Sequence, residues 1–270
     1  GIVVVGYTMV MISGGCDMSV GGQLALCGMF AATLNVTYGL PTFVVVILTL
    51  MLGALFGLIN GLLMNVFNIM PLIVTLGTML FFQGASYIIS GGVAIFGLSD
   101  SFKFIGQGYL GFVPLPIVIL LVIGMLGYIV LHKTYFGRQI YAMGGNPEAA
   151  RLAGVNIKKY RLAVFTITGI LAAVAGIIMA ARTGSAQPSA GASYPFDCMT
   201  AVVLGGVSFA GGSGSMLGAM MGVIIIGVLN NGMQLVGMDS NMINCVKGIV
   251  LLIAIGIDSV QRTGKKAKKV

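Results

Sequence analysis

Residues 43 to 58 read FVVVILTLMLGALFGL, an apolar run without a charged residue. The run forms four turns of helix, whereas a strand of a membrane barrel would alternate apolar and polar side chains. It therefore predicts a membrane-spanning helix. Apolar stretches occur at about 1 to 12, 18 to 37, 41 to 64, 71 to 91, 112 to 131, 162 to 181, 197 to 209, 216 to 236 and 241 to 257. We predict an all-α polytopic membrane protein with about nine transmembrane helices in this chain.

The composition agrees with a membrane protein. Of the 270 residues, 58% are hydrophobic and 7% are charged, against roughly 25% charged in a soluble domain. The net charge of +8 is spread too thinly to form a nucleic-acid-binding face. The four cysteines lie in apolar stretches without metal-ligand spacing, so we predict buried free thiols and no metal site. They are Cys16, Cys27, Cys198 and Cys245.

The first apolar stretch is short. The chain starts with Gly1, and about a dozen residues are too few for a span of about 20. We expect at least one further span before residue 1, so that residues 1–270 form one N-terminally truncated transmembrane domain.

Positive charge is concentrated in two segments. Eleven of the fourteen Lys and Arg residues lie in a loop at 132–161 or in a basic tail at 259–270. Cytoplasmic segments carry such an excess, so we predict that both are cytoplasmic. An even number of crossings must then separate them. Three longer stretches follow the loop, so residues 197 to 209 must also cross or half-cross the membrane.

Two breaks interrupt the apolar stretches. One spans residues 13 to 21, where Asp17 or Ser19 is expected to cap the next helix; the other is the glycine-rich segment 211–215. Non-helical backbone at membrane depth must be buried in protein or line a wet cavity, so the breaks indicate a transport pathway. The alternative for the first break is an ordinary cytoplasmic turn outside the bilayer.

Repeated small residues give two further expectations. Residues 57–60 read GLIN and residues 227–230 read GVLN, a weak match that, with the topology above, predicts an inverted repeat. Glycines recur every four residues at 53, 57 and 61 and again at 218 and 222, which favours close helix packing within the subunit.

The cytoplasmic loop contains a helix signal. Asn146 suits the N-cap, Pro147 the first helical position, Glu148 the first turn and Gly154 the end. These residues predict a surface helix of about seven residues. A helix this short is marginal in water, so it needs its own bundle or a docked partner to pack against.

Three separated motifs carry a resemblance to a known family. Residues 14–21 read GGCDMSVG, similar to GG-x-DLSVG; residues 136–150 follow the pattern FGR-x-x-x-A-x-GGN-x-x-AA; and residues 205–212 read GGVSFAGG. Over essentially its whole length the chain resembles the inner-membrane permeases of bacterial ABC importers of the ribose, xylose and galactose type. Cys16 and Met18 replace the common Ile and Leu, which bears on substrate selectivity.

The resemblance implies a bundle of ten transmembrane helices per subunit that imports a monosaccharide or similar small polar solute into the cytoplasm. It also implies a second permease subunit, identical or related, a cytoplasmic ABC ATPase and an extracytoplasmic solute-binding protein. The chain itself is expected to be no enzyme and to carry no cofactor, since it lacks a G-x-x-x-x-G-K-[ST] motif. ATP and Mg²⁺ would be held by the ATPase.

Other functions stay open from the sequence. Members of the same family that carry nucleosides or autoinducer-2 are the first alternative. An ion-coupled secondary transporter is the second, although it would normally carry an acidic residue inside a span. A membrane-embedded enzyme lacks a convincing acid, base or metal cluster.

Two sets of site residues follow. The ATPase-coupling segment matched by the resemblance comprises Asn146, Pro147, Glu148, Ala149, Ala150, Arg151, Leu152, Ala153 and Gly154. Glu148 and Arg151 are expected to make polar contacts across that interface, or else to be solvated charges. The pathway candidates, whose alternative role is hydrogen bonding between helices, are Cys16, Asp17, Ser19, Asn35, Asn60, Gln83, Asn230, Asn231 and Gln234.

The remaining charges are expected to be structural. Lys247 lies inside the last span, where a cation must snorkel or pair, and Asp239 is the nearest acidic residue in sequence. Arg182 and Asp197 bracket a loop predicted to be extracytoplasmic; they could hold it or help to receive the binding protein. The basic tail could bind anionic membrane lipid or fix the topology.

Overall fold

The computed structural model describes the backbone of residues 1–267 and the side chains of residues 1–260. The five cationic side chains of the predicted basic tail, which lie beyond residue 260, are therefore outside the described ones. The helices are α1 (Ile2–Ile12), α2 (Val20–Val36), α3 (Thr42–Phe67), α4 (Pro71–Ser90), α5 (Asp100–Gln107), α6 (Leu115–Lys133), α7 (Tyr135–Gly145), α8 (Pro147–Leu152), α9 (Ile157–Thr183), α10 (Tyr194–Leu204), α11 (Met216–Leu235) and α12 (Ser240–Ala267). Four two-residue strands form two antiparallel pairs, β1 (Ile95–Phe96) with β4 (Ser185–Ala186) and β2 (Tyr109–Leu110) with β3 (Val113–Pro114).

Nine of the described helices match the nine apolar stretches of the sequence. Six of them are long and apolar enough to cross a membrane: α3, α4, α6, α9, α11 and the described part of α12. The other three, α1, α2 and α10, are apolar but shorter. Large apolar side chains such as Phe43 and Leu80 lie exposed on the outer helices, as lipid-facing residues do. The prediction of a polytopic all-helical membrane protein is confirmed.

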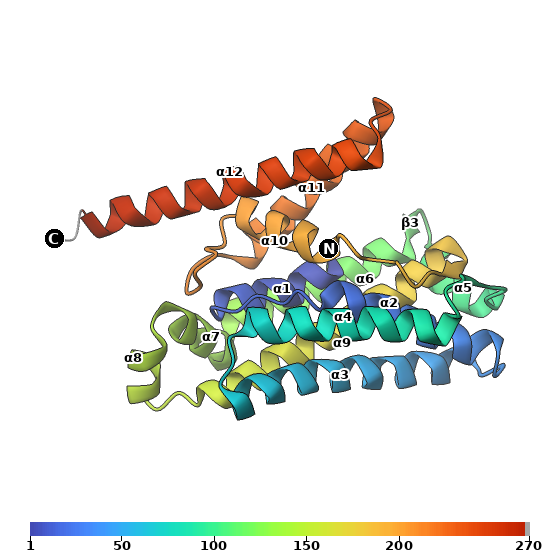
Figure 1. Ribbon diagram of the computed structural model, residues 1–270, viewed down its shortest axis with the longest axis horizontal. Coiled ribbons are helices and arrows are strands. Elements are labelled where there is room, and N and C mark those ends of the chain that lie inside the picture. The colour runs from blue at the N-terminus through green and yellow to red at the C-terminus, as the bar shows by residue number, and fades with distance from the viewer. Residues whose placement is uncertain (268–270) are drawn as a thin grey trace.

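Helix α1 forms the centre of the bundle. Every residue from Ile2 to Ile12 is buried, because α6, α9, α10 and α11 all pack around it. A helix that is apolar on all sides is kept from water, here by the surrounding helices and not by lipid. Figure 1 shows α1 between α9 on one side and α10 on the other.

Glycines bring two pairs of helices into backbone contact. A Cβ atom at Gly57 of α3 would lie 2.2 Å from the carbonyl oxygen of Phe165 in α9, and one at Gly169 of α9 would lie 2.2 Å from that of Gly53. A Cβ atom at Gly222 of α11 would lie 1.8 Å from the carbonyl oxygen of Ala201 in α10. The predicted close packing within the subunit is confirmed.

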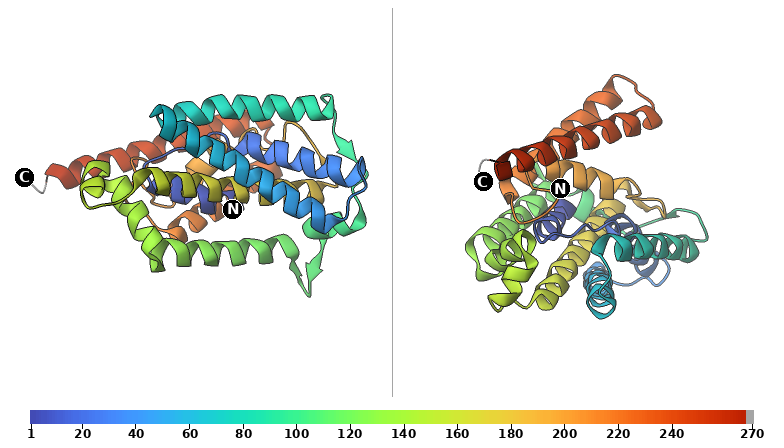
Figure 2. Two further views of the ribbon diagram at one scale, coloured as in Figure 1. Left: turned by 90° about the horizontal axis from the view of Figure 1, so that it is seen from below. Right: turned by 60° about the vertical axis from the view of Figure 1, so that its left-hand side comes forward.

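The ends of the bundle differ. Helices α7 and α8 and the C-terminal end of α12 lie at one end, and α5 lies at the other (Figures 1 and 2). The four helices α9, α10, α11 and α12 alternate in direction between these two ends (Figure 1), so the short α10 is in the position of the crossing or half-crossing that the even count required. Because α10 has 11 residues, it is about 16 Å long and does not reach across a bilayer by itself.

The sequence repeat is only partly reflected in the structure. Helices α3 and α11, which carry the two copies, run in opposite directions (Figure 1), as an inverted repeat requires. The matched asparagines differ in environment: Asn60 is fully buried, whereas Asn230 is half-buried beside a cavity.

Three local predictions are wrong. Cys245 is exposed, whereas Cys16, Cys27 and Cys198 are the buried free thiols expected. The Lys247 ammonium pairs with Asp197 at 2.9 Å, not with Asp239, because α12 packs along α10. The α2 N-terminus has no side-chain cap, since the predicted capping residues bind each other instead.

Candidate functional site

Helix α8 is built as its sequence predicts. The Asn146 side chain accepts from the Ala149 backbone N–H at 3.1 Å, and Pro147 occupies the first turn. Gly154 has φ +85°, the left-handed conformation that ends a helix. Its N–H donates to Arg151 O, and the next N–H donates to Ala150 O. The helix has six residues, one fewer than expected.

One face of α8 is open. Leu152 is 83% exposed, whereas Ala150 on the opposite face is buried. Arg151 and Glu148 lie 3.8 Å apart with side chains 71% and 81% exposed, a geometry that contributes little to stability. The face thus presents one large apolar side chain and two charges of opposite sign, free to meet another protein.

Helix α7, which precedes α8 and was not predicted, ends in a junction of three chain segments. Five glycines from these segments meet there, and we call them the glycine junction: Gly14, Gly144, Gly145, Gly211 and Gly212. A Cβ atom at Gly144 would lie 1.8 Å from the carbonyl oxygen of Ile12, where α1 ends, and one at Gly212 would lie 2.5 Å from the Gly145 Cα. The Gly212 N–H also donates to the Ile12 carbonyl oxygen at 2.8 Å. The end of α7 therefore touches both breaks, backbone against backbone.

Two side chains reinforce the junction. The Tyr141 hydroxyl of α7 donates to Gly214 O at 2.7 Å. His132, at the end of α6, accepts through Nε2 from the N–H of Met216 at 3.1 Å. Met216 is the first residue of α11. The His132 ring lies 4.9 Å from that of Tyr128 and 6.1 Å from that of Tyr141. The start of α11 is thereby tied to α6 and α7.

The α10–α11 break is also held from outside. Asp258 of α12 accepts through Oδ2 from the Ser208 hydroxyl and from the Phe209 N–H, each at 3.1 Å. Sequence reasoning missed Asp258, because about fifty residues separate it from its partners and its surroundings look like an ordinary apolar span. It anchors the start of the loop, whereas Tyr141 and the glycine junction hold its second half.

The α1–α2 break contains a polar cluster formed by Asp17, Ser19, Gln23 and Asn60. The Ser19 hydroxyl donates to Asp17 Oδ1 and accepts from Gln23 Nε2 at 2.7 Å and Asn60 Nδ2 at 2.8 Å. All four residues have zero exposure. Three of them are pathway candidates from the sequence. Gln23 was missed, although its position one helical turn after Ser19 is a signal that could have found it.

The other pathway candidates lie elsewhere. Cys16 contacts the Tyr7 hydroxyl through its sulfur at 3.1 Å, next to the cluster. Asn35 binds the Ser99 N–H at 2.8 Å and so ties the end of α2 to the start of α5. The remaining four are dispersed, Gln83 and Asn230 half-buried and Asn231 and Gln234 exposed. The structure therefore does not assemble the predicted set into one path.

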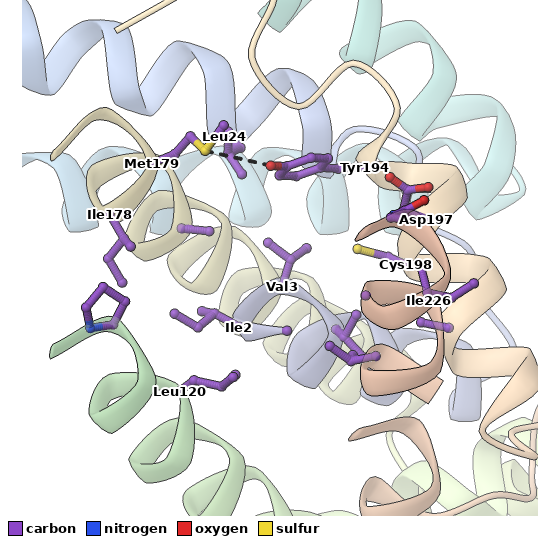
Figure 3. Close-up of a pocket in the computed structure, with 18 of the residues that line it drawn as sticks. Ile2, Val3, Leu24, Leu120, Ile178, Met179, Tyr194, Asp197, Cys198 and Ile226 are labelled. Atoms are coloured by element: carbon purple, nitrogen blue, oxygen red, sulfur yellow. Dashed lines mark hydrogen bonds between the residues drawn. The ribbon is translucent and has the colours of Figure 1, made fainter. Parts of the chain in front are cut away.

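A cavity of about 400 Å³ lies between α1, α6, α9, α10 and α11. Its walls are mainly apolar, including Ile2, Leu120 and Ile226 (Figure 3). Tyr194 and Asp197 supply polar groups from α10, and the Tyr194 hydroxyl donates to the Met179 sulfur at 3.7 Å. Of the pathway candidates only Asn230 lines it. Its volume lies in the range of small-molecule sites.

Residues 1–255 match the family described as the branched-chain amino acid transport system / permease component. The chain belongs to this permease family. It is 41% identical to the ribose import permease protein of Bacillus subtilis over 96% of this chain and 80% of that protein. It is 35% identical to the galactose/methyl galactoside import permease protein of Haemophilus influenzae over 98% of this chain and 84% of the relative.

A third relative, the autoinducer 2 import system permease protein of Yersinia enterocolitica, is 36% identical over 94% of this chain and 78% of its own length. No solved structure matches the chain. This permease is a multi-pass membrane protein and a transport subunit, not an enzyme. The three motifs of the sequence resemblance supply all five residues of the glycine junction.

Proposed function

We propose that this permease imports a monosaccharide or a closely similar small polar solute as the membrane subunit of an ABC importer. The observation that carries the proposal is the 41% identity to a ribose import permease over 96% of the chain. The name of the family model refers to amino acids, but the relatives compared above are named for sugars or for autoinducer-2. The relative named for autoinducer-2 makes that compound the second candidate.

The partners follow from the importer class. An ATPase subunit would bind and hydrolyse ATP with Mg²⁺, since the chain has no P-loop motif. A solute-binding protein would deliver the solute from the other side, and a second permease, identical or related, would complete the membrane part.

We place the ATPase on α8. An exposed Leu152 flanked by a Glu and an Arg fits an interface whose apolar anchor is surrounded by polar groups. Because α7 ends against both breaks, a displacement of α8 would be passed to the end of α1 and to the α10–α11 break through close backbone contacts. The solute pathway would lie along these broken helices, beside the cavity lined by α1 and α10.

The side of the membrane follows from charge. The α7–α8 end is the cytoplasmic side in this proposal, because eleven of the fourteen cations lie in the loop or the tail. A cysteine introduced at Ser189 should react with an impermeant reagent added outside intact cells, and one introduced at Asn156 should not. The reverse labelling would contradict the orientation.

The substrate is tested by uptake. A strain that lacks its own ribose, galactose and autoinducer-2 importers is supplied with this permease and its neighbouring transport genes, and the uptake of each radiolabelled solute is measured. Saturable ribose or galactose uptake supports the sugar proposal, and uptake of autoinducer-2 alone favours the second candidate. The permease is also purified in mild detergent from its native membrane; recovery without any P-loop ATPase in several detergents would contradict the importer assignment.

A further inference from the structure

The polar cluster contains three oxygen atoms without a hydrogen-bond partner. They are Asp17 Oδ2, Gln23 Oε1 and Asn60 Oδ1, and each is buried. All three are acceptors in the orientation found. Buried polar atoms are normally satisfied, so three unpaired acceptors around one serine indicate a missing partner.

The orientation of the two amides is fixed by donor counting. The Ser19 hydroxyl has one proton, which it donates to Asp17 Oδ1. It can therefore only accept from Gln23 and Asn60, so both amides must turn their nitrogens toward Ser19. Each amide oxygen is bonded to the same carbon as the nitrogen held by Ser19. Each free amide oxygen is therefore one amide group away from the Ser19 hydroxyl oxygen. The Asp17 carboxylate is bound to the same hydroxyl.

The charge of the cluster is also uncompensated. The ion pairs found among the described side chains join Lys103 to Asp100, Arg151 to Glu148 and Lys247 to Asp197, and none includes Asp17. Asp17 has zero exposure. A carboxylate removed from water requires an opposite charge or a proton.

Among single occupants of the cluster, only one meets both demands; a proton on Asp17 together with one water molecule is the two-part alternative, and the titration below distinguishes the two. A proton on Asp17 neutralises the charge and bonds one amide oxygen, but it leaves the other unpaired. A water molecule has two protons for three acceptors and leaves the charge. A divalent cation would leave one excess positive charge, because Asp17 is the one carboxylate among the four residues of the cluster. A monovalent cation would take all three oxygens as ligands and neutralise Asp17.

We propose that Asp17, Gln23 and Asn60 bind a hard monovalent cation of the sodium class in the α1–α2 break. Oxygen ligands from a carboxylate and from amide groups suit such a cation. The bound ion joins the start of α2 to α3 at the break. Because the cluster is fully buried, the ion exchanges only when the segment between α1 and α2 moves. Occupancy is thereby coupled to the conformation of the break.

The experiment uses the permease purified in detergent with the subunits that accompany it. Thermal unfolding is followed in NaCl, in KCl and in N-methylglucamine chloride at equal ionic strength. We expect Na⁺ or K⁺ to raise the unfolding temperature saturably, by about 5 °C at roughly a hundred times the dissociation constant. Binding of ²²Na⁺, or its displacement by K⁺, should saturate at one ion for each permease chain.

Two variants locate the ion. Asp17→Asn keeps the shape of the side chain and removes the charge, so the cation-dependent shift should be lost. Asp239→Asn is the matched control, because Asp239 is exposed and its side chain accepts, among the described residues, only from the Asn241 N–H; it should keep the full shift. Asn60→Leu removes one ligand and should raise the cation concentration for half-maximal effect at least tenfold.

The wild-type titration alone can overturn the proposal. An unfolding temperature that is equal in all three salts, together with no saturable ²²Na⁺ binding, would mean that Asp17 is protonated. Stabilisation by Mg²⁺ or Ca²⁺ alone would also contradict a monovalent site, and so would an unchanged cation response in Asp17→Asn. None of these results depends on which solute the importer carries.

Discussion

Both breaks contact the C-terminal end of α7, but different kinds of group fix their conformation. The α1–α2 break is fixed by side chains that bind one another around Ser19. The α10–α11 break is a backbone turn with positive φ at Gly206, Gly211, Gly212 and Gly214, and its polar anchors, Asp258 and Tyr141, come from other helices. The first break is therefore a preformed polar centre, and the second takes its shape from its neighbours. A movement of α7 would deform the second break more easily than the first.

The largest effect is expected from a substitution that disturbs the backbone of both breaks. Gly144→Val places a Cβ atom 1.8 Å from the Ile12 carbonyl oxygen and 2.7 Å from the Gly212 nitrogen. Backbone atoms cannot rotate away as a side chain can, so we expect the free energy of unfolding to fall by about 3 kcal/mol or more. Solute transport should be lost as well. Thermal unfolding in detergent and solute uptake measure the two effects.

The neighbouring glycine is the control. A Cβ atom at Gly145 meets nothing within 4 Å, so Gly145→Ala should unfold within a few degrees of the wild type and still transport. Equal damage from both substitutions would mean that helix flexibility in α7, not backbone contact, sets the requirement for glycine.

A second test concerns the far end of α10. Lys247 and Asp197 are paired with side chains 16% and 19% exposed, so Lys247→Met leaves a largely buried carboxylate without its counter-ion, although the Ser193 hydroxyl still donates to it. We expect a loss of roughly 2 kcal/mol, below the range for fully buried pairs. The double variant Lys247→Met/Asp197→Asn should cost less than the sum of the two single variants by about 1 kcal/mol. Strict additivity in unfolding experiments would show that the pair does not hold α12 against α10.

The sequence predicted local features well and long-range partners poorly. Spans, the α8 caps and the glycine-rich helix faces could be read from it because each depends on residues within a few turns, whereas the partners of the glycines, such as Phe165 for Gly57, lie far away in the sequence. The pairing of Lys247 with Asp197 bridges fifty residues, and proximity in sequence favoured Asp239 instead. The pathway candidates were chosen as polar residues in apolar helices, but Asn35 serves as a tie to a loop. A polar residue in an apolar helix indicates that a hydrogen-bond partner is needed, but it does not indicate which partner.

A smaller effect is expected from the external anchor of the second break. Asp258→Leu leaves the buried Ser208 hydroxyl and the Phe209 N–H without this acceptor, which should cost about 1 to 2 kcal/mol of stability. Asp258→Asn keeps an oxygen in the same place and should restore most of it. If the Asn variant is as unstable as the Leu variant in thermal unfolding, the charge of Asp258 and not its role as an acceptor is what matters.

The smallest effect on stability should accompany a clear effect on coupling. The Glu148–Arg151 pair is mostly exposed, so the double variant Glu148→Ala/Arg151→Ala should change stability by less than about 0.5 kcal/mol. If α8 docks on the ATPase, solute-stimulated ATP hydrolysis by the assembled importer should fall about tenfold, which corresponds to roughly 1.4 kcal/mol of docking free energy. Leu152→Asp should lower it further, because an exposed apolar anchor becomes a charge.

The chain offers a matched control for this last prediction at the opposite end of the bundle. Lys103 and Asp100 form another ion pair three residues apart, at 3.4 Å, with Asp100 exposed and Lys103 half-buried, so Lys103→Ala/Asp100→Ala removes an i,i+3 ion pair from α5. Coupled hydrolysis should be unchanged in that variant. If both double variants reduce hydrolysis equally, α8 has no special role in coupling. The backbone contacts between α7 and the two breaks would then stabilise the fold without transmitting a movement of the ATPase.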